Sequence, residues 1–264
     1  MKYDYSTPGG MLKHMISRIN EEFVNLLNND KRVIDWIDKN GVDNVYIATK
    51  QMTMTRYIQT QLFDHKGHLT YKYVNDVLMQ MNSTELYAPF SITTRYKIKD
   101  DKVYVTGCIL IIRTGTIASD IALFIHDIEN IWKRYQWLLK HEVGHLVDHI
   151  NHRNGISIKE FQDCKSQTIR DYMNHDKWHA EYKQKPGYNP DTANRHYYNI
   201  PSEAAANEAA GIDVDEMIKI DGEYRKMWDN KNISIDINIL NVEDKPKNDG
   251  KETNNDVDIK EKKT

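Results

Sequence analysis

His141-Glu142-Val143-Gly144-His145 is the stretch that decides how this chain of 264 residues is interpreted. On an α-helix, residues four apart lie on the same face, so the imidazoles of His141 and His145 can converge on one metal ion. Glu142 lies about 100° round the helix from His141, which keeps its carboxylate off the ion but beside a water bound there. The spacing therefore predicts a helix that carries two metal ligands and a general base.

The residues around this motif fit an amphipathic helix. Apolar side chains recur on both sides of it at helical spacing, at Leu138, Leu139, Val143, Leu146, Val147 and Ile150. Gly144 has no side chain, so another part of the protein can approach the helix closely there. The alternative is a chance match on an ordinary amphipathic helix, which this context makes the poorer explanation.

Composition disfavours several classes of protein. The net charge of -3 gives no basic surface for nucleic acid, and no apolar run is long enough to span a membrane. The two cysteines are too few for a disulfide framework or a cysteine zinc site, and the first residues lack the features of a secretory signal. We expect a cytoplasmic protein with no nucleic-acid or membrane partner. Its richness in Lys, Asn and Ile suggests an AT-rich genome, such as that of a phage.

Hydrophobic periodicity predicts helices and then a sheet in the first half of the chain. Apolar residues at three- and four-residue steps predict helices over residues 11–27, 31–39 and 71–81. Strand patterns cover residues 42–48, 86–98 and 102–113, with a polar link of hairpin length between the last two. Gly107, inside the last run, indicates a bulge or a close approach of another backbone. That run could line a peptide groove or be an ordinary buried strand.

The second half is predicted to be mainly helical. Ser119-Asp120 has the pattern of a helix start, and we expect a break near Asn130 before a separate metal-binding helix. Asn154-Gly155 should end that helix. Further helices are predicted over residues 157–172, 201–211 and 214–228, an irregular polar segment over 173–200, and a strand over 233–239.

A metal ion held by two histidines needs another protein ligand, and the nearby histidines do not provide it. His149 is eight residues from His141, a rise of about 12 Å, whereas ligands lie about 2 Å from an ion. His152 is further still. The extended pattern that recruits a third histidine nearby also fails, because Asp148 stands at its glycine position and Asn151 at its histidine position.

The ligand is therefore expected from a second helix, residues 201–211. Glu203 is the best candidate, with Asn207 one turn later to hydrogen-bond a ligand histidine. The alanines of this helix leave room for another helix or a metal site against its backbone. Glu208 is an alternative ligand, and both glutamates could instead be carboxylates that the helix dipole favours.

The two motifs together resemble those of the gluzincin zinc peptidases, and are similar in particular to the lethal-factor-like and ImmA/IrrE-type branches. His141 to Asp148 carry His-Glu-x-Gly-His-x-x-Asp, and Glu203 to Asn207 carry Glu-x-x-Ala-Asn. The resemblance implies that Glu203 is the third zinc ligand. It also implies an α+β, zincin-like fold, mainly helical with a small mixed sheet. Asn207 departs from the acidic residue of the first branch and Ala209 from the aromatic residue of the second, so the branch stays open.

His196, Tyr197 and Tyr198 lie just before the second motif. In the resembling families a tyrosine or histidine near this point stabilises the oxyanion of the tetrahedral intermediate. Each of the three is a candidate for that role, with ordinary packing as the alternative. The other histidines are interpreted as surface or core residues, at positions 14, 65, 68, 126, 175 and 179.

The sequence thus predicts a peptidase in which His141, His145 and Glu203 bind Zn2+ and leave a fourth position for water. Glu142 is predicted to be the general base, and the expected partner is a peptide or protein substrate. A non-catalytic, zinc-stabilised binding or assembly protein is the alternative, which Glu142 disfavours because a structural site needs no base.

Three parts of the chain are expected. Residues 1–41 should form an N-terminal helical segment and residues 42–240 the zincin-like metallopeptidase domain. Residues 241–264 are rich in charge and poor in apolar side chains, so they should form a disordered tail.

Overall fold

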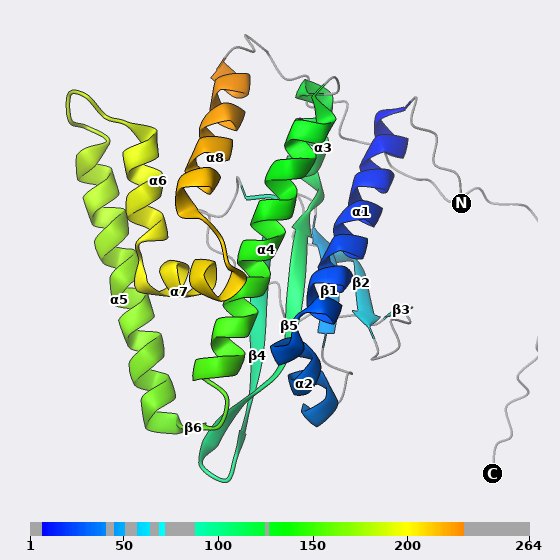
Figure 1. The fold of residues 1–264 in the computed structure, drawn as a ribbon, viewed down its shortest axis with the longest axis vertical. Helices are drawn as coiled ribbons and strands as arrows, with labels where there is room; N and C mark the ends of the chain where they lie inside the picture. Colours follow the sequence, from blue (N-terminus) through cyan, green and yellow to red (C-terminus); the bar gives the residue numbers. More distant parts are fainter. Residues whose placement is uncertain are drawn as a thin grey trace, which may run out of the picture. The chain divides into compact units, whose positions relative to one another are not determined.

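A computed structural model describes residues 7–40, 45–50, 57–63, 69–71, 88–124 and 127–229. These residues form an α+β fold that is mainly helical, with one sheet behind the central helices in the view of Figure 1. They all belong to one compact unit, Met1–Ser234. The predicted helix over residues 71–81, the strand over 233–239 and the tail lie outside the described residues, apart from Tyr71, which ends a strand.

The first two helices agree with the prediction from periodicity. They are α1 (Pro8–Asn29) and α2 (Lys31–Asn40). Thr7 caps α1, since its hydroxyl accepts a hydrogen bond from Gly10 N at 3.1 Å. Asp30 separates the helices, and its carboxylate accepts a bond from Arg32 N at 2.9 Å at the start of α2.

The sheet has the order β3-β2-β1-β5-β4, with β6 also paired to β5. Its strands are β1 (Val45–Lys50), β2 (Tyr57–Phe63), β3 (Leu69–Tyr71), β4 (Phe90–Lys99), β5 (Lys102–Arg113) and β6 (Ile156–Ser157). β1 and β5 pair in parallel and the other neighbours are antiparallel, so the sheet is mixed.

The predicted hairpin is confirmed as β4 and β5. Asp100 and Asp101 form its tip with φ values of 50° and 57°, the conformation that a tight hairpin turn requires. The pairing shifts by one residue beside Gly107, which confirms the predicted bulge. Because β5 lies between β1 and β4, it is a buried central strand and does not line an open groove. Among the described strands, the end of the sheet on this side is β4.

One predicted boundary is wrong and another is confirmed. The helix expected to start at Ser119-Asp120 begins earlier, as α3 (Thr114–Leu123), directly after β5. Asp120 does not cap a helix, because its buried carboxylate accepts hydrogen bonds from the hydroxyls of Tyr135 and Tyr224, both at 2.6 Å. The break expected near Asn130 is present, since α3 ends at Leu123 and α4 (Ile128–His152) is a separate helix.

Most of the segment predicted to be irregular, residues 173–200, is helical. The helix expected to end at Tyr172 continues as α5 (Ile158–Tyr182), and α6 (Pro190–Tyr198) follows it. These helices pack through aromatic and histidine side chains, including Trp178 stacked on His196 at 3.6 Å between ring centroids. A prediction based on aliphatic periodicity misses this kind of packing. The last two helices, α7 (Pro201–Ala210) and α8 (Val214–Asp229), confirm the prediction.

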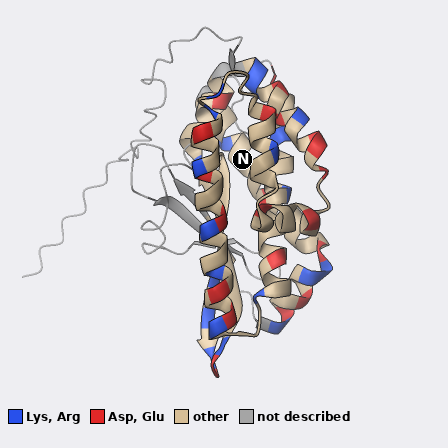
Figure 2. Ribbon diagram, turned by 90° about the vertical axis from the view of Figure 1, so that its left-hand side faces the viewer, with Lys and Arg blue, Asp and Glu red and all other residues tan. Residues whose placement is uncertain are grey.

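The core lies between the sheet and the helices α1 and α4, which run side by side in Figure 1. It contains Ile19 and Phe23 of α1, Leu110 and Ile112 of β5, and Leu139 of α4. Acidic and basic residues alternate along the outer helices, without a long stretch of one sign (Figure 2). In the described part of the chain, every helix is too short or too polar to cross a membrane.

Candidate metal centre

The site is built where α7 crosses α4 at very short range. A Cβ at Gly144 would lie 2.1 Å from the carbonyl oxygen of Ala206 and 3.0 Å from Cβ of Ala210, so no larger residue fits without moving a helix. The predicted close approach at Gly144 is therefore present, and the small residues of α7 make it possible. Pro201 begins α7, and Gly211 ends it in the left-handed conformation with φ 62°. This crossing brings Glu203 to the histidines of α4.

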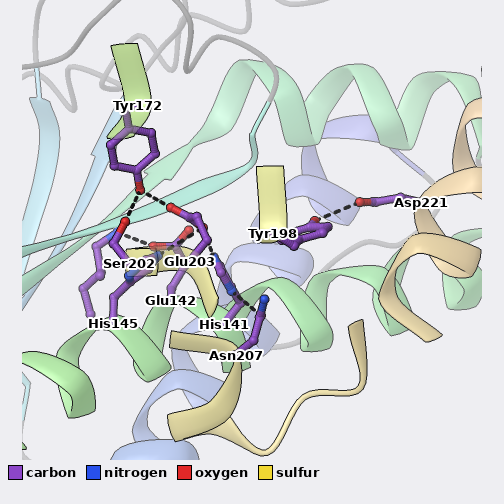
Figure 3. Close-up of polar contacts among 10 residues, drawn as sticks. His141, Glu142, His145, Tyr172, Tyr198, Ser202, Glu203, Asn207 and Asp221 are labelled. Atoms are coloured by element: carbon purple, nitrogen blue, oxygen red, sulfur yellow. Dashed lines mark hydrogen bonds and ion pairs between the residues drawn. The ribbon is translucent and has the colours of Figure 1, made fainter. Parts of the chain in front are cut away.

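Three side chains from these helices converge (Figure 3). Glu203 Oε2 lies 2.8 Å from His141 Nε2 and 3.5 Å from His145 Nε2. One potential ligand atom from each of the three residues lies within 4.8 Å of the others, and no other group of three such residues occurs in the described part of the chain. Glu203 is 1% exposed and His141 5%.

This donor set fits zinc. Two imidazole nitrogens and one carboxylate oxygen are ligands that catalytic zinc sites use. Ligands about 2 Å from a tetrahedral ion lie roughly 3.3 Å from each other, close to the two measured separations. His141, His145 and Glu203 are therefore the residues that would hold the ion.

Asn207 orients the first histidine, as the sequence predicted. Its side-chain oxygen lies 2.8 Å from His141 Nδ1, which donates the hydrogen bond and thereby turns Nε2 towards Glu203. Burial opposes a charge on His141, but the hydrogen bond and the charge of Glu203 raise the pKa of the imidazole to about 9. Burial likewise opposes the charge on Glu203, yet His145 and His141 hold its pKa well below the usual range. The proton that His141 and Glu203 share stands where a cation could bind between the same atoms.

Glu142 stands apart from the three potential ligands. Its Oε2 accepts a hydrogen bond from the backbone N–H of Ile92 in β4, at 2.7 Å. Burial raises the pKa of Glu142, and the positive charges of His145 and His141 only partly offset this effect. A carboxylate with a raised pKa beside a metal site is a better proton acceptor than a solvated one.

Two of the three oxyanion candidates, His196 and Tyr198, have partners outside the ligand cluster. Tyr198 donates its hydroxyl to Asp221 at 3.1 Å, although its ring packs 5.9 Å from that of His141. His196 Nδ1 lies 2.8 Å from His175 Nδ1. Tyr197 stays a candidate, because burial and next the negative charge of Glu203 raise the pKa of its hydroxyl well above the usual range. Figure 3 shows the Tyr198 hydroxyl turned away from Glu203 towards Asp221.

Tyr172 of α5 is the functional candidate that sequence reasoning missed. Its hydroxyl donates a hydrogen bond to Glu203 Oε1 and accepts one from Ser202 Oγ at 3.2 Å. No motif links Tyr172 to Glu203, which is 31 residues away. Only the packing of α5 against α7 brings the two together.

Three other residues were considered as ligands in the sequence, and all three lie outside the cluster. Glu208 is exposed, on a different face of α7 from Glu203. His149 Nδ1 contacts the hydroxyls of Tyr96 and Thr94, at 2.9 and 2.8 Å, and His152 contacts Asp148.

Comparisons with models of known protein families, with curated proteins and with solved structures found no match to this chain. The chemistry must therefore be inferred from the site itself.

Proposed function

We propose that this chain is a zinc-dependent peptidase, with a gluzincin-type site on a zincin-like fold. One observation carries the proposal: Glu203 of α7 meets His141 and His145 of α4, while Glu142 is held out of that cluster. Three protein ligands leave a position for water, whereas a structural zinc site usually has four protein ligands. A carboxylate beside the cluster supplies the base that hydrolysis needs.

Each residue has a distinct role in this mechanism. His141, His145 and Glu203 would hold the zinc ion, which would supply a coordinated water of lowered pKa, towards about 7, and a positive charge for the scissile carbonyl. Glu142 accepts a proton from the water as it attacks the carbonyl carbon and then passes that proton to the leaving amine. The N–H of Ile92 holds the Glu142 carboxylate in place for both transfers.

The substrate in this proposal is an extended peptide or protein segment beside β4. β4 ends the order of the described strands, and its residues follow α4 from Glu142 to His149. An exposed strand edge binds extended peptides through backbone hydrogen bonds. A peptide bound there would lie next to Glu142 and the ligand cluster.

A non-catalytic role for zinc is the second candidate. Glu203 and His141 are buried, His145 is partly exposed, and the cluster joins α4 to α7, so an ion there would also stabilise their contact. In that case Glu142 would have no chemical task, and its replacement would change neither metal content nor biological activity.

Glu142→Gln tests the proposal. The wild type and this variant should each contain about one zinc per chain, because neither loses a ligand. Hydrolysis of a peptide library, followed by mass spectrometry of the new termini, should fall at least about a hundredfold in the variant.

Glu208→Gln is the matched control, because it removes an exposed carboxylate from the neighbouring helix. It should leave both zinc content and hydrolysis unchanged. A wild type that folds without binding zinc would refute the proposal. Near-normal turnover by Glu142→Gln would refute the role of Glu142.

A further inference from the structure

The two oxygens of Glu203 have different surroundings. Oε2 faces His141 and His145, at 2.8 and 3.5 Å. Oε1 accepts the hydrogen bond of the Tyr172 hydroxyl. A carboxylate can bind a metal ion through one oxygen or through both, and the partner of the second oxygen helps to decide which.

Tyr172 is itself oriented by a neighbour on α7. Ser202 Oγ donates to the phenol oxygen at 3.2 Å, so the phenol hydrogen is directed away from Ser202 and towards Glu203. A phenol is neutral at pH 7, so it can donate a hydrogen bond to the carboxylate. It carries no negative charge that would itself attract the metal ion. The hydrogen bonds from Ser202 to Tyr172 and from Tyr172 to Glu203 thus link α7 and α5 at the cluster (Figure 3).

We propose that Tyr172 is a positioning residue that holds Oε1 of Glu203, so that only Oε2 is available as a metal ligand. This inference rests on the proposed zinc site and adds a residue to it from a third helix, α5. A glutamate that bound through both oxygens would make the ion five-coordinate and crowd the position in which a catalytic site needs water. Tyr172 therefore acts on the reaction through Glu203, by keeping that position open.

The experiment compares the wild type with Tyr172→Phe. Zinc affinity, measured by competition with a chromophoric chelator, should fall about tenfold, the usual lower range when a partner of a ligand is removed. The visible absorption of the Co2+-substituted protein should change from the intense bands of a four-coordinate ion to the weaker bands of a five-coordinate one. The second readout reports ligand geometry, which a loss of packing alone would not alter in this way.

Tyr135→Phe is the matched control. Tyr135 is a buried tyrosine on α4 whose hydroxyl also donates to a buried carboxylate, that of Asp120, at 2.6 Å. The control should lose a similar amount of folding stability but keep the zinc affinity and the Co2+ spectrum of the wild type. Ser202→Ala removes only the group that orients the phenol, so it should weaken zinc binding less than Tyr172→Phe does. It also provides a test if Tyr172→Phe does not fold.

The outcomes separate this inference from the proposed function. A wild type without bound zinc would refute both. A wild type that binds zinc and hydrolyses peptides, together with a Tyr172→Phe variant of unchanged affinity or an unchanged Co2+ spectrum, would refute only the role of Tyr172. If Tyr172→Phe does not fold, an unchanged affinity in Ser202→Ala has the same consequence.

Discussion

Two helices of this protein carry nearly the same motif in different surroundings. α4 contains His141-Glu142-Val143-Gly144-His145, and α5 contains His175-Asp176-Lys177-Trp178-His179. In α4 the two imidazole rings lie edge to face, with centroids 4.7 Å apart at 78°. In α5 the rings are stacked, with centroids 5.8 Å apart at 29°.

The partners of the two histidine pairs explain the difference. His141 and His145 face the carboxylate of Glu203, which α7 provides. His175 faces another imidazole, that of His196, and its pKa is lowered by burial and by the neighbouring histidines. A carboxylate could attract a cation to the first pair, whereas the second pair packs α5 against α6. Four-residue spacing places histidines on one face, but the opposing helix decides their chemistry.

Replacing one histidine of each pair should give the largest difference. His145→Ala should abolish zinc binding, because two remaining ligands are too few to hold the ion. His179→Ala, the matched change on α5, should leave the zinc content of the wild type. Metal analysis after desalting measures both. Zinc retained by His145→Ala, or lost from His179→Ala, would reverse the assignment of the two pairs.

The close contact of α4 with α7 is the next target. Gly144→Ala should destabilise the protein by about 2 kcal/mol, because overpacking at the contact outweighs the helical preference of alanine. It should also weaken zinc binding, since α7 carries Glu203. Gly222→Ala is the control in α8, where the new Cβ would meet its nearest atom, Asp191 Oδ1, at 3.5 Å, an ordinary contact. Thermal unfolding should show stabilisation of the control by up to about 1 kcal/mol.

The second residue that α7 directs at the cluster is Asn207, and its loss should have a smaller effect. Asn207→Ala removes the acceptor of the His141 Nδ1–H bond, so zinc affinity should fall about tenfold. The exposed Glu208 is one residue away, and Glu208→Gln should leave the affinity unchanged. Chelator competition compares the two variants. A loss confined to Glu208→Gln would show that the other glutamate is the ligand.

Local patterns predicted most of the helices, the hairpin and the members of the cluster. His141, Glu142 and His145 share a short motif, and Glu203 and Asn207 lie one helical turn apart, so their relation is visible in the sequence. The predicted start of α3 was wrong because Asp is a residue type common at helix N-caps. Asp120 is instead buried and accepts hydrogen bonds from two tyrosines. Tyr172 was missed because only tertiary packing brings it to Glu203.

The α5–α6 pair shows the same limit in a larger region. Its contacts are between rings, such as Trp178 with His196 and Trp178 with Tyr182. Histidine and tyrosine are partly polar, so they add little to the apolar pattern of a sequence. The periodicity of aliphatic residues therefore stops near Tyr172 although the helix continues to Tyr182. Likewise, no local rule connects Glu142 with the N–H of Ile92, 50 residues away.

Replacing His149 should have the smallest effect on stability. It is on α4, like His141 and His145, but it is not part of the cluster. It follows His145 by one turn, but it contacts the hydroxyls of Tyr96 and Thr94 instead of the cluster. Burial lowers its pKa to about 2, with further contributions from Arg153 and His145. Like His175, it is therefore a neutral packing residue.

This depressed pKa predicts how stability depends on pH. The folded protein keeps His149 neutral, whereas the unfolded chain binds a proton below about pH 6.5, so the contribution is complete above that pH and is lost as the pH falls. At pH 6 the loss relative to pH 8 is about 0.8 kcal/mol. Denaturant unfolding of chelator-treated wild type and His149→Gln measures it, because the difference between the two proteins cancels the titration of His141 and other groups. Equal pH dependence in both proteins would mean that His149 has the same pKa in the folded and the unfolded protein, so that it does not belong with the neutral histidines.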